Sequence, residues 1–516
     1  MKKEYLVSAK EMKQLDENTI SKTQIPSLVL MERASMAIAE AVMKYLNNVK
    51  DNRVLVVAGN GNNGADGICV GRILKEYGYH VDICLLSCRH EFTEELLLQK
   101  KIADIYGIPF LNEGEVDFSH YKVVIDAIFG IGLNRDVEGP ARELISKIND
   151  SECYVISADI PSGINATTGA VCGVAVKADE TITFGFYKAG QLFYPGRTYC
   201  GNITKAYIAI DEHSFYDKEP SMFTYQSDLT EKIDFGRDMA GNKGTFGKVL
   251  VVAGRDFSAG AALLCATSAL RSGCGMVAVF TEAANKEAFL ADLPEAMVET
   301  YSPEDTDAQR LAKMDKWLKW ADVCVIGCGL SKDKVAYNLL SHVVTCFNKP
   351  IVADADALQL FAMHEELKDA VYERCLDKER ASVIFTPHPG ELASLAHCSI
   401  ADVKSNRLET AENVCREYGV ILVAKDADTL CLAEGEKTYL NGSGNDGMST
   451  AGSGDVLAGL IGSFLAQAMR NNMDLYESAC LAVYIHGLAG DYQAKKNGKS
   501  FMVASDIIEA YKYILK

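Results

Sequence analysis

A glycine-rich stretch near the carboxyl end of the chain carries residues suited to phosphoryl transfer. It reads NGSGNDGMSTAGSGDVLAG, residues 441–459, and it runs into an apolar segment whose large side chains recur at helical spacing. The glycines are therefore predicted at a helix N-terminus, where free backbone N–H groups and the helix dipole favour a phosphate. Asp455 falls in the first turn, and a carboxylate there can deprotonate a hydroxyl that attacks a phosphoryl group.

Two interpretations of Asp455 remain open from this stretch alone. In the first, Asp455 is a base; a carboxylate at a helix N-terminus stays ionised, so it would be a weak base that acts mainly through its position. In the second, Asp455 is an ordinary helix cap in a glycine-rich turn. The long run of Gly, Ser, Thr and Asn before it favours a nucleotide-type site.

A second set of polar residues follows three apolar segments in the first half of the chain. GNGNNGADG (59–67) lacks the spacing of a dinucleotide-binding fingerprint, but it suits a phosphate at a helix start. Asn63, Asp126 and Ser162 offer oxygen atoms that could hold a hard cation. Asp159, at the end of CYVISA, is a candidate acid or base. Each residue alone could be a turn or cap residue, but three strand ends together favour one site.

Polar residues also end several apolar segments of the second half. They are Gly327, Gly329, Asp354, Asp356, His388, Glu391 and Lys425. Taken singly, His388 between two prolines reads as a surface loop, and Asp354 and Asp356 read as helix caps. Lys425 would pair with phosphate oxygens if a nucleotide lay nearby. His486, on a late helix, is expected to be a core residue.

These residues need parallel sheets to bring them together. Apolar segments predict strands at 53–59, 78–86, 121–130, 153–160, 179–185, 247–254, 276–280, 322–329, 350–356, 382–390 and 419–426, and a hairpin at 429–442. Helical patterns occupy 25–46, 66–77, 92–106 and 259–271. Continuously apolar strands that alternate with helices indicate α/β domains with helices on both faces of a sheet.

Length and composition limit the class of protein. A chain of 516 residues is expected to form two or three domains. The net charge of −18 argues against nucleic acid as a partner. Sixteen cysteines without paired spacing, and no apolar leader, indicate a reduced, cytoplasmic protein. The longest apolar stretch, 456–469, is too short to cross a membrane, so no membrane association is expected.

Three motifs of the first half carry a resemblance. GNGNNGADG, DAIFGIGLNRDVEGP and ADIPSGINATTG, in this order, resemble the N-terminal domain of the NAD(P)H-hydrate epimerases, the YjeF N-terminal family, over residues 1–211. The resemblance implies a Rossmann-like three-layer α/β domain and a potassium ion held by Asn63, Asp126 and Ser162. The substrate contacts that it implies are Asn62, Asn63, Gly64, Ala65, Asp66, Gly130, Ile131, Gly132, Leu133, Asn134, Arg135, Asp136 and Asp159. The family usually has Gly-Gly where this chain has Gly64 and Ala65.

The second half resembles the partner domain of the same repair system. NKGTFGKVLVVAG, DADAL, TPHPGEL and GNDGMSTAGSGDVLAG resemble the ribokinase-like ADP/ATP-dependent NAD(P)H-hydrate dehydratases over residues 242–516. The resemblance implies that Ala261, Gly329, His388 and Asp455 contact the hydrated dinucleotide. It implies that Lys425, Asp426, Ala427, Asp428, Thr429 and Gly454 contact the adenine nucleotide. AKDADT departs from the usual Lys-Gly-Ala-Gly-Thr and places two extra carboxylates, Asp426 and Asp428, in the nucleotide loop.

We therefore predict an epimerase domain over 1–215, a linker over 216–241 with its Tyr and Phe on a surface, and a dehydratase domain over 242–516. The resemblance implies that the first domain interconverts the R and S forms of NADHX and NADPHX, with Asp159 as acid or base. The second would dehydrate the S form with Mg²⁺ and ADP, or less favourably ATP, through a phosphorylated intermediate, with Asp455 as base. The fusion of both domains favours ADP. We also expect a homo-oligomer.

Two alternatives stay open. The second half could be a true small-molecule kinase that releases a stable phosphoester, although the HPGE element argues against this reading. The first half could be a binding module without catalytic activity. The complete set of Asn63, Asp126, Asp159 and Ser162 argues for catalysis instead.

Overall fold

The computed structural model describes residues 2–47, 52–86, 92–216, 218–226, 239–255, 258–377 and 379–515. These residues form two compact units, one of Tyr5–Met222 and the other of Met1–Glu4 with Phe223–Lys516. Each unit is an α/β structure built on its own mainly parallel sheet. The predicted fold class is confirmed for both halves.

The main sheet of the first unit is parallel, in the order β4-β3-β2-β5-β6-β7-β9. Its strands are β2 (Arg53–Ala58), β3 (His80–Leu85), β4 (Phe110–Leu111), β5 (Val123–Ala127), β6 (Tyr154–Ala158), β7 (Glu180–Phe184) and β9 (Asn202–Ala206). A short parallel pair joins Leu6 and Val7 of β1 (Lys2–Val7) to β8 (Tyr187–Lys188). The carboxyl ends of β2, β5 and β6 therefore meet at one edge, as the motifs require.

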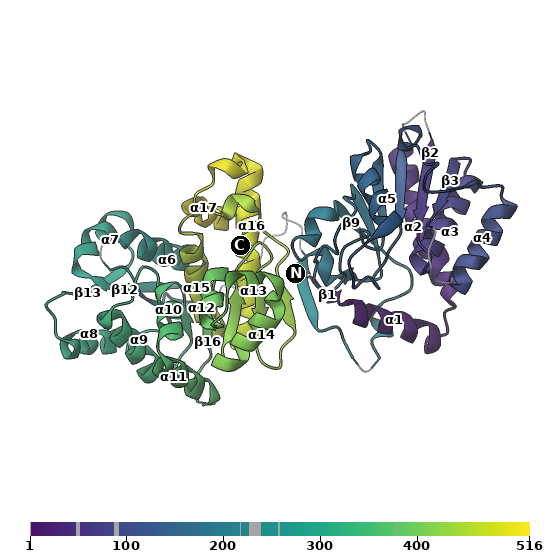
Figure 1. The fold of residues 1–516 in the computed structure, drawn as a ribbon. Helices are drawn as coiled ribbons and strands as arrows, with labels where there is room; N and C mark the ends of the chain where they lie inside the picture. Colours follow the sequence, from purple (N-terminus) through teal and green to yellow (C-terminus); the bar gives the residue numbers. More distant parts are fainter. Residues whose placement is uncertain are drawn as a thin grey trace. The chain divides into compact units, whose positions relative to one another are not determined.

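Helices cover both faces of this sheet. They are α1 (Ala9–Ser21), α2 (Ser27–Leu46), α3 (Asn62–Glu76), α4 (Glu94–Ile105) and α5 (Gly139–Asp150). Alternate side chains of β2 point to opposite faces, as a strand requires. Val54 and Val56 pack in a core with α2 and α3, whereas Leu55 and Val57 pack in a second core with α5. Figure 1 shows this three-layer arrangement.

The sheet of the second unit has the order β13-β12-β11-β14-β15-β16-β17-β18-β19-β10. Its strands are β10 (Met222–Gln226), β11 (Lys248–Val252), β12 (Met276–Glu282), β13 (Met297–Tyr301), β14 (Val323–Ile326), β15 (Ile351–Ala353), β16 (Val383–Phe385), β17 (Ile421–Ala424), β18 (Leu430–Leu432) and β19 (Thr438–Leu440). The pairs from β13 to β17 are parallel, and β18 and β19 form the predicted antiparallel hairpin.

The helices of the second unit also form two layers. They are α6 (Ala259–Arg271), α7 (Lys286–Asp292), α8 (Asp307–Trp320), α9 (Lys334–Cys346), α10 (Asp356–Met363), α11 (Glu365–Leu376), α12 (Pro389–Leu395), α13 (Ile400–Ser405), α14 (Arg407–Tyr418), α15 (Ser453–Asn471), α16 (Leu475–Asn497) and α17 (Ala504–Ile514). A hydrophobic core packs α6, α15, α16 and α17 against one face of the sheet. Figure 1 shows α8, α9, α11 and α14 on the opposite side.

Helix α15 lies at the centre of the second unit because its glycines allow close packing. A Cβ atom on Gly459 would lie 2.1 Å from the carbonyl oxygen of Cys265 in α6. A Cβ atom on Gly462 would lie 2.4 Å from the side chain of Val325 in β14. Both approaches are possible only without a side chain. They fix the start of α15, and with it Asp455, beside the ends of β14 and β15.

The segment predicted as a linker contains a strand. Strand β10 lies next to β19 in the second sheet, and residues 227–238 lie outside the described residues. The prediction that the aromatic residues here lie on a surface is wrong for Phe223 and Tyr225, which are buried. Their ring centroids lie 5.4 and 5.0 Å from that of Tyr439. Burial of two aromatic rings is a strong reason for β10 to pair here.

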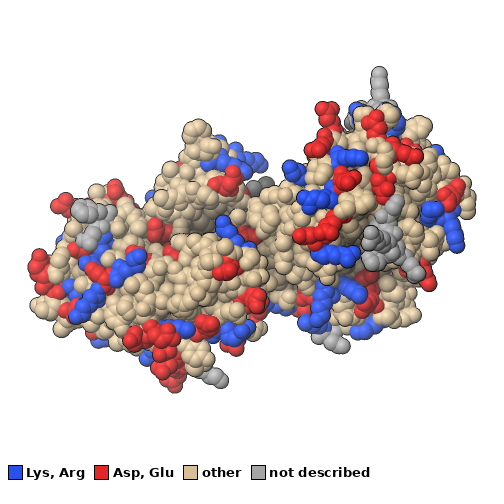
Figure 2. All heavy atoms as spheres, viewed as in Figure 1, with Lys and Arg blue, Asp and Glu red and all other residues tan. Residues whose placement is uncertain are grey.

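Charge, cysteine burial and helix hydropathy can be read from the described residues. Acidic and basic side chains are interspersed on the face that Figure 2 shows, without a broad basic patch. The described cysteines are free thiols, and most are buried. Among the described residues, no helix combines the length and apolar character needed to cross a bilayer.

Candidate active sites

A pocket of about 670 Å³ opens at the carboxyl ends of β2, β5 and β6 in the first unit. It brings together these predicted residues: Asn62, Asn63, Asp66, Gly130, Ile131, Gly132, Leu133, Asn134, Arg135 and Asp159. Helix α1 adds Lys13 and Asp16, which the sequence patterns did not indicate. Residues from four separate segments thus face one cavity large enough for part of a dinucleotide.

Three predicted contacts do not line this pocket: Gly64, Ala65 and Asp136. Gly64 packs against backbone, because a Cβ atom there would lie 2.1 Å from the carbonyl oxygen of Gly59. Ala65 lies in α3 with its methyl group fully buried in the core, so the replacement of the usual glycine is accommodated by packing. The N-terminus of α3 has no side-chain cap, and its N–H groups remain available to an anion.

Asp159 is held in one orientation by a buried lysine. Its backbone has φ of +65°, in the left-handed region, which is uncommon for a residue with a side chain. Its carboxylate accepts a hydrogen bond of 2.9 Å from the N–H of Phe184 and forms an ion pair with Lys188. Burial lowers the pKa of Lys188, and Asp159 opposes this effect. Lys188 was missed from the sequence, although a lysine within the apolar run FGFYKAG was an available signal.

The predicted cation ligands cluster beneath this pocket. Ser162 donates to Asp126 through both its N–H, at 2.8 Å, and its hydroxyl, at 2.5 Å. Ser157 donates a third hydrogen bond to Asp126, at 2.8 Å. The Asn63 side chain lies beside Gly130, and its amide nitrogen is buried without a partner. Burial raises the pKa of Asp126, since no cationic side chain among the described residues pairs with it.

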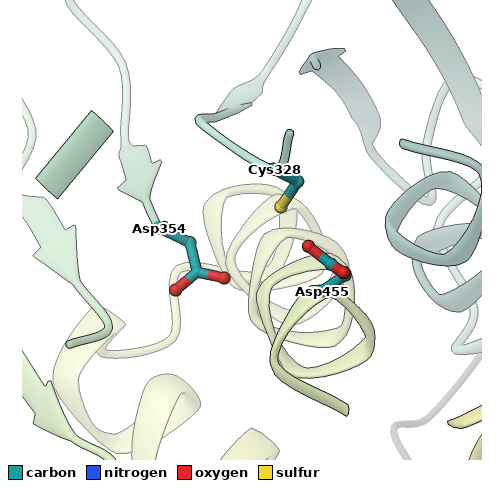
Figure 3. Close-up of side chains that lie close together, drawn as sticks. All are labelled: Cys328, Asp354 and Asp455. Carbon is teal, nitrogen blue, oxygen red and sulfur yellow. The ribbon is translucent and has the colours of Figure 1, made fainter. Parts of the chain in front are cut away.

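A second cluster forms in the other unit around the start of α15. Figure 3 shows the side chains of Cys328, Asp354 and Asp455 directed toward one another, with one ligand atom from each within 4.8 Å of the others. Burial, and then the charge of Asp354, raise the pKa of Asp455 to about 6, while the Cys328 thiol lowers it by donating a hydrogen bond. Asp455 is therefore a stronger base than an ordinary aspartate, contrary to the expectation of a weak one, because its burial disfavours the charged form.

Lys425 lies within this cluster. Its Nζ donates to Asp354 at 2.7 Å, and Thr386 donates to the same carboxylate oxygen at 2.7 Å. Burial opposes the charge on Lys425, but Asp354 and Glu391 outweigh it and raise the pKa. A Cβ atom on Gly454 would lie 3.1 Å from this Nζ. The lysine therefore presents its charge at the N-terminus of α15, where both features favour a phosphate.

His388 has a definite hydrogen-bonding role at the start of α12. Its Nδ1 accepts from the N–H groups of Gly390, at 3.0 Å, and Glu391, at 3.3 Å. Burial, together with Lys425, lowers the pKa of His388, so the ring is neutral and carries its hydrogen on Nε2. Burial also raises the pKa of Glu391 to about 7. His388 is thus a fixed donor with a half-exposed ring, not a mere surface loop residue.

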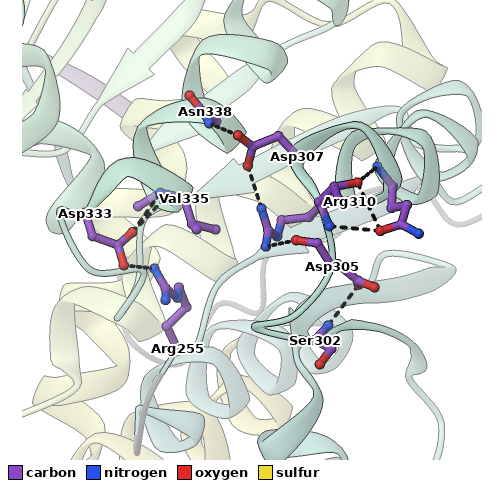
Figure 4. Close-up of polar contacts among 11 residues, drawn as sticks. Arg255, Ser302, Asp305, Asp307, Arg310, Asp333, Val335 and Asn338 are labelled. Atoms are coloured by element: carbon purple, nitrogen blue, oxygen red, sulfur yellow. Dashed lines mark hydrogen bonds and ion pairs between the residues drawn. The ribbon is translucent and has the colours of Figure 1, made fainter.

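The loop that carries Gly329 is fixed by polar contacts. The N–H of Arg255 donates to the carbonyl of Gly329 at 2.8 Å. The Arg255 side chain pairs with Asp333, which accepts from the N–H of Val335 at 2.9 Å and so caps α9. Figure 4 shows this pair near a second network in which Arg310 binds Asp305 and Asp307. Ala261 lies beside Gly329: a Cβ atom on Gly329 would lie 3.4 Å from the Cβ atom of Ala261.

The extra carboxylates of the nucleotide loop have a structural partner. Arg407, on α14, forms an ion pair with the buried Asp428 and donates to the carbonyl of Ala424 at 2.9 Å. Asp426 lies 3.8 Å from the same guanidinium and accepts from the N–H of Ala427 at 2.9 Å. Arg407 thus joins both ends of the loop that contains Lys425. This pairing explains the departure from the family pattern, because Asp428 turns toward the protein.

Removing Asp428 should weaken nucleotide binding. In Asp428→Ala the mostly buried Arg407 loses the closer of its two carboxylate partners, which should cost about 3 kcal/mol of stability. We expect a lower melting temperature and a KM for the nucleotide raised about tenfold, with a smaller change in kcat. Asp426→Ala is the control, since that carboxylate is partly exposed and 3.8 Å from Arg407. Equal effects of the two substitutions would contradict the role given to Asp428.

His486 is buried on α16, as predicted for a core residue. Burial lowers its pKa to about 4, so the imidazole is neutral. The expectation that Asp356 caps a helix is wrong: it is the first residue of α10, no side chain among the described residues caps that helix end, and its carboxylate instead accepts from the N–H of Ser331 at 2.8 Å. Neither residue is needed to build the cluster around Asp455.

Comparisons with known proteins match both halves in order. A family model described as NAD(P)H-hydrate dehydratase matches residues 249–512, and one described as YjeF-related protein N-terminus matches residues 27–190. The bifunctional NAD(P)H-hydrate repair enzyme Nnr of Moorella thermoacetica is 32% identical over 536 residues, covering 99% of this chain and 97% of that protein. The enzyme of the same name from Escherichia coli is 31% identical, covering 89% and 84%.

Among solved structures, an ADP/ATP-dependent NAD(P)H-hydrate dehydratase from Bacillus subtilis, co-crystallised with ATP and Mg²⁺, is 24% identical with a TM-score of 0.45. The match covers 55% of this chain and 94% of the chain in that solved structure. The assignment depends instead on the relatives that span the full length and on the two matched family models. The chain belongs to the family of bifunctional NAD(P)H-hydrate repair enzymes.

Proposed function

We propose that residues 1–215 interconvert the R and S forms of NADHX and NADPHX, and that residues 242–516 dehydrate the S form with ADP, or ATP, as donor. The segment 216–241, which contains strand β10 of the second unit, joins the two domains. The observation that carries the second activity is Asp455, a carboxylate with a pKa of about 6 in the first turn of α15 and close to Lys425. A base and a phosphate site on one helix end suit phosphoryl transfer to a hydroxyl.

In the dehydratase site, Asp455 takes the proton of the ring hydroxyl as its oxygen attacks the terminal phosphoryl group. Lys425 and the N–H groups at the start of α15 stabilise the charge on the phosphoryl oxygens. ADP leaves as AMP, or ATP as ADP. The ring C–O bond then breaks, phosphate departs, and the neighbouring ring carbon loses a proton to restore the double bond. His388 donates from Nε2 to the dinucleotide, and Gly329 and Ala261 form the wall beside it.

Mg²⁺ fits this site because Asp354 presents carboxylate oxygens, the ligands that this ion prefers, close to the phosphate position. Bound with the nucleotide, the ion would neutralise charge on the phosphates. Lys425 and the N–H groups at the start of α15 also stabilise the negative charge of the phosphates, and they do so whether or not the ion is bound. The donor is tested by supplying the hydrate mixture with Mg²⁺ and either ADP or ATP while following the absorbance of the reduced nicotinamide. A kinase of small molecules would instead accumulate a stable phosphoester.

In the epimerase site, Asp159 acts on the ring and the free N–H groups of α3 bind phosphate. A potassium ion fits the residues beneath: Asp126 is fully buried without a cationic partner among the described residues, and Ser162 and Asn63 lie near it. The ion would supply positive charge that holds the loops together. Asn63, Asp126 and Ser162 are the residues that would bind it.

The potassium site can be tested without an activity assay. We expect KCl to raise the melting temperature of the first unit more than LiCl does, since an ion that binds only the folded state stabilises it. Asp126→Asn should abolish this difference and lower the epimerase rate, with dehydratase activity unchanged. Asp104→Asn, an exposed carboxylate on α4, is the control. A potassium effect that persists in Asp126→Asn would contradict the assignment.

A further inference from the structure

Three aspartates line the pocket of the first unit, and among the described residues only one of them has a cationic partner. They are Asp16 on α1, Asp66 on α3 and Asp159 after β6. Asp159 pairs with Lys188. No hydrogen bond or ion pair from the described residues reaches the carboxyl group of Asp16 or Asp66. Burial and the charge of Asp159 raise the pKa of both unpaired aspartates, Asp16 and Asp66, which favours a proton on one of them.

Asp66 is the group whose surroundings most favour the neutral form. Burial, and then the charges of Asp159 and Asp16, raise its pKa well above the ordinary value, and no cation opposes them. The pKa of Asp16 is raised by the same kinds of cause, but Lys188 partly opposes the shift. The other charged residues that line the pocket are Lys13, Glu95 and Arg135. A raised pKa means that Asp66 keeps its proton to higher pH than an ordinary aspartate.

Asp159 and Asp66 therefore stand in opposite environments within one cavity. Lys188 and the N–H of Phe184 bind the carboxylate of Asp159, whereas no hydrogen-bond donor or cation among the described residues contacts the carboxyl group of Asp66. Two carboxyl groups that are held in different protonation states can divide the acid and base roles of a reaction between them. Lys188 thus positions Asp159. Of the two carboxyl groups, Asp66 is therefore the candidate for the proton donor.

We propose that Asp66 is the general acid of the epimerisation and that Asp159 is the base that works with it. This proposal rests on the proposed epimerase function. The proton of Asp66 passes to the ring hydroxyl, the C–O bond breaks, and water leaves while the lone pair of the ring nitrogen forms a C=N⁺ bond. Water then adds to the opposite face of the same carbon and gives a proton to Asp159. One proton enters from Asp66 and one leaves to Asp159, so the hydrate is unchanged except at that centre.

The test uses the full-length chain and the purified R and S hydrates. Asp66→Asn should lower the epimerase kcat about 100-fold with little change in KM, which is the effect expected for loss of a general acid. In the native enzyme kcat should fall at high pH as Asp66 loses its proton, and this decrease should be absent in Asp66→Asn. Asp16→Asn should shift the decrease to lower pH, because it removes a negative charge near Asp66.

Controls separate this proposal from a loss of fold and from the proposed function itself. Dehydratase activity of Asp66→Asn reports that the chain is folded, and Asp104→Asn, exposed on α4, controls for the change of net charge. An Asp66→Asn variant that changes only KM, or that keeps the decrease at high pH, would overturn the proposal. Absence of epimerase activity in the native enzyme would instead overturn the proposed function.

Discussion

Asp455→Asn should abolish dehydration and leave epimerisation intact. The substitution keeps the size of the side chain but removes the group that accepts the hydroxyl proton, so we expect kcat to fall about 10³-fold. Lys425 and the start of α15 remain in place, and nucleotide binding should change little. The measurement is the recovery of reduced nicotinamide from S hydrate with Mg²⁺ and ADP. Retained turnover would exclude Asp455 as the base.

The pH dependence of the dehydratase gives an independent check of the same residue. A base works only when ionised, and the pKa of Asp455 is about 6, so the rate should decrease on the acidic side of that pH, about tenfold per unit. The rate should be level above it until another group titrates. Glu391, with a pKa of about 7, lies near the same charges and is checked with Glu391→Gln. If the residual activity of Asp455→Asn still decreases below pH 6, the decrease in the native enzyme does not come from protonation of Asp455.

Asp159→Asn should have the converse effect: epimerisation falls about 100-fold and dehydration is unchanged. The substitution also leaves Lys188 buried without its charged partner, which should cost about 3 kcal/mol in the first unit. The double variant Asp159→Asn with Lys188→Met removes both charges and separates loss of catalysis from loss of fold. We measure the exchange of purified R hydrate into the S form, with an enzyme-free sample as the reference.

If the double variant is stable and still epimerises at the native rate, Asp159 is not the acid or base of the reaction. If it is stable and inactive while dehydration of S hydrate is unaffected, the two activities belong to separate sites of one chain. Thermal unfolding of each variant shows which of these conditions holds. The outcome does not depend on the identity of the phosphoryl donor.

Much of the architecture follows from local sequence patterns. Continuously apolar segments such as 53–59 form central parallel strands because both of their faces are covered by helices. Gly-rich motifs locate the helix starts, and Asp455 lies in the first turn of α15 as expected. The strand β10 escaped prediction because its segment is short and lies in a polar stretch. Its burial depends on Tyr439, which is distant in sequence.

The candidate sites could be located from sequence more easily than their electrostatics could be predicted. The raised pKa of Asp455 depends first on burial and then on the charge of Asp354, and neither is visible in the sequence near residue 455. The pairing of Asp428 with Arg407 joins residues on different elements, so the sequence shows only an unusual carboxylate. Lys188 likewise reads as an isolated lysine until the fold places it against Asp159. Contacts between residues that are distant in sequence cannot be read from local patterns and become visible only in the folded structure.

The most direct test of two separate active sites in one chain is the extent of cofactor recovery from a mixture of R and S hydrates. With Mg²⁺ and excess ADP, the native enzyme should restore the absorbance of the whole mixture. The double variant at Asp159 and Lys188 should rapidly restore only the S portion, Asp455→Asn should restore none, and the two variants mixed together should restore the whole. Rapid recovery of the R portion by the double variant alone, or failure of the mixed variants to go beyond the S portion, would contradict the assignment.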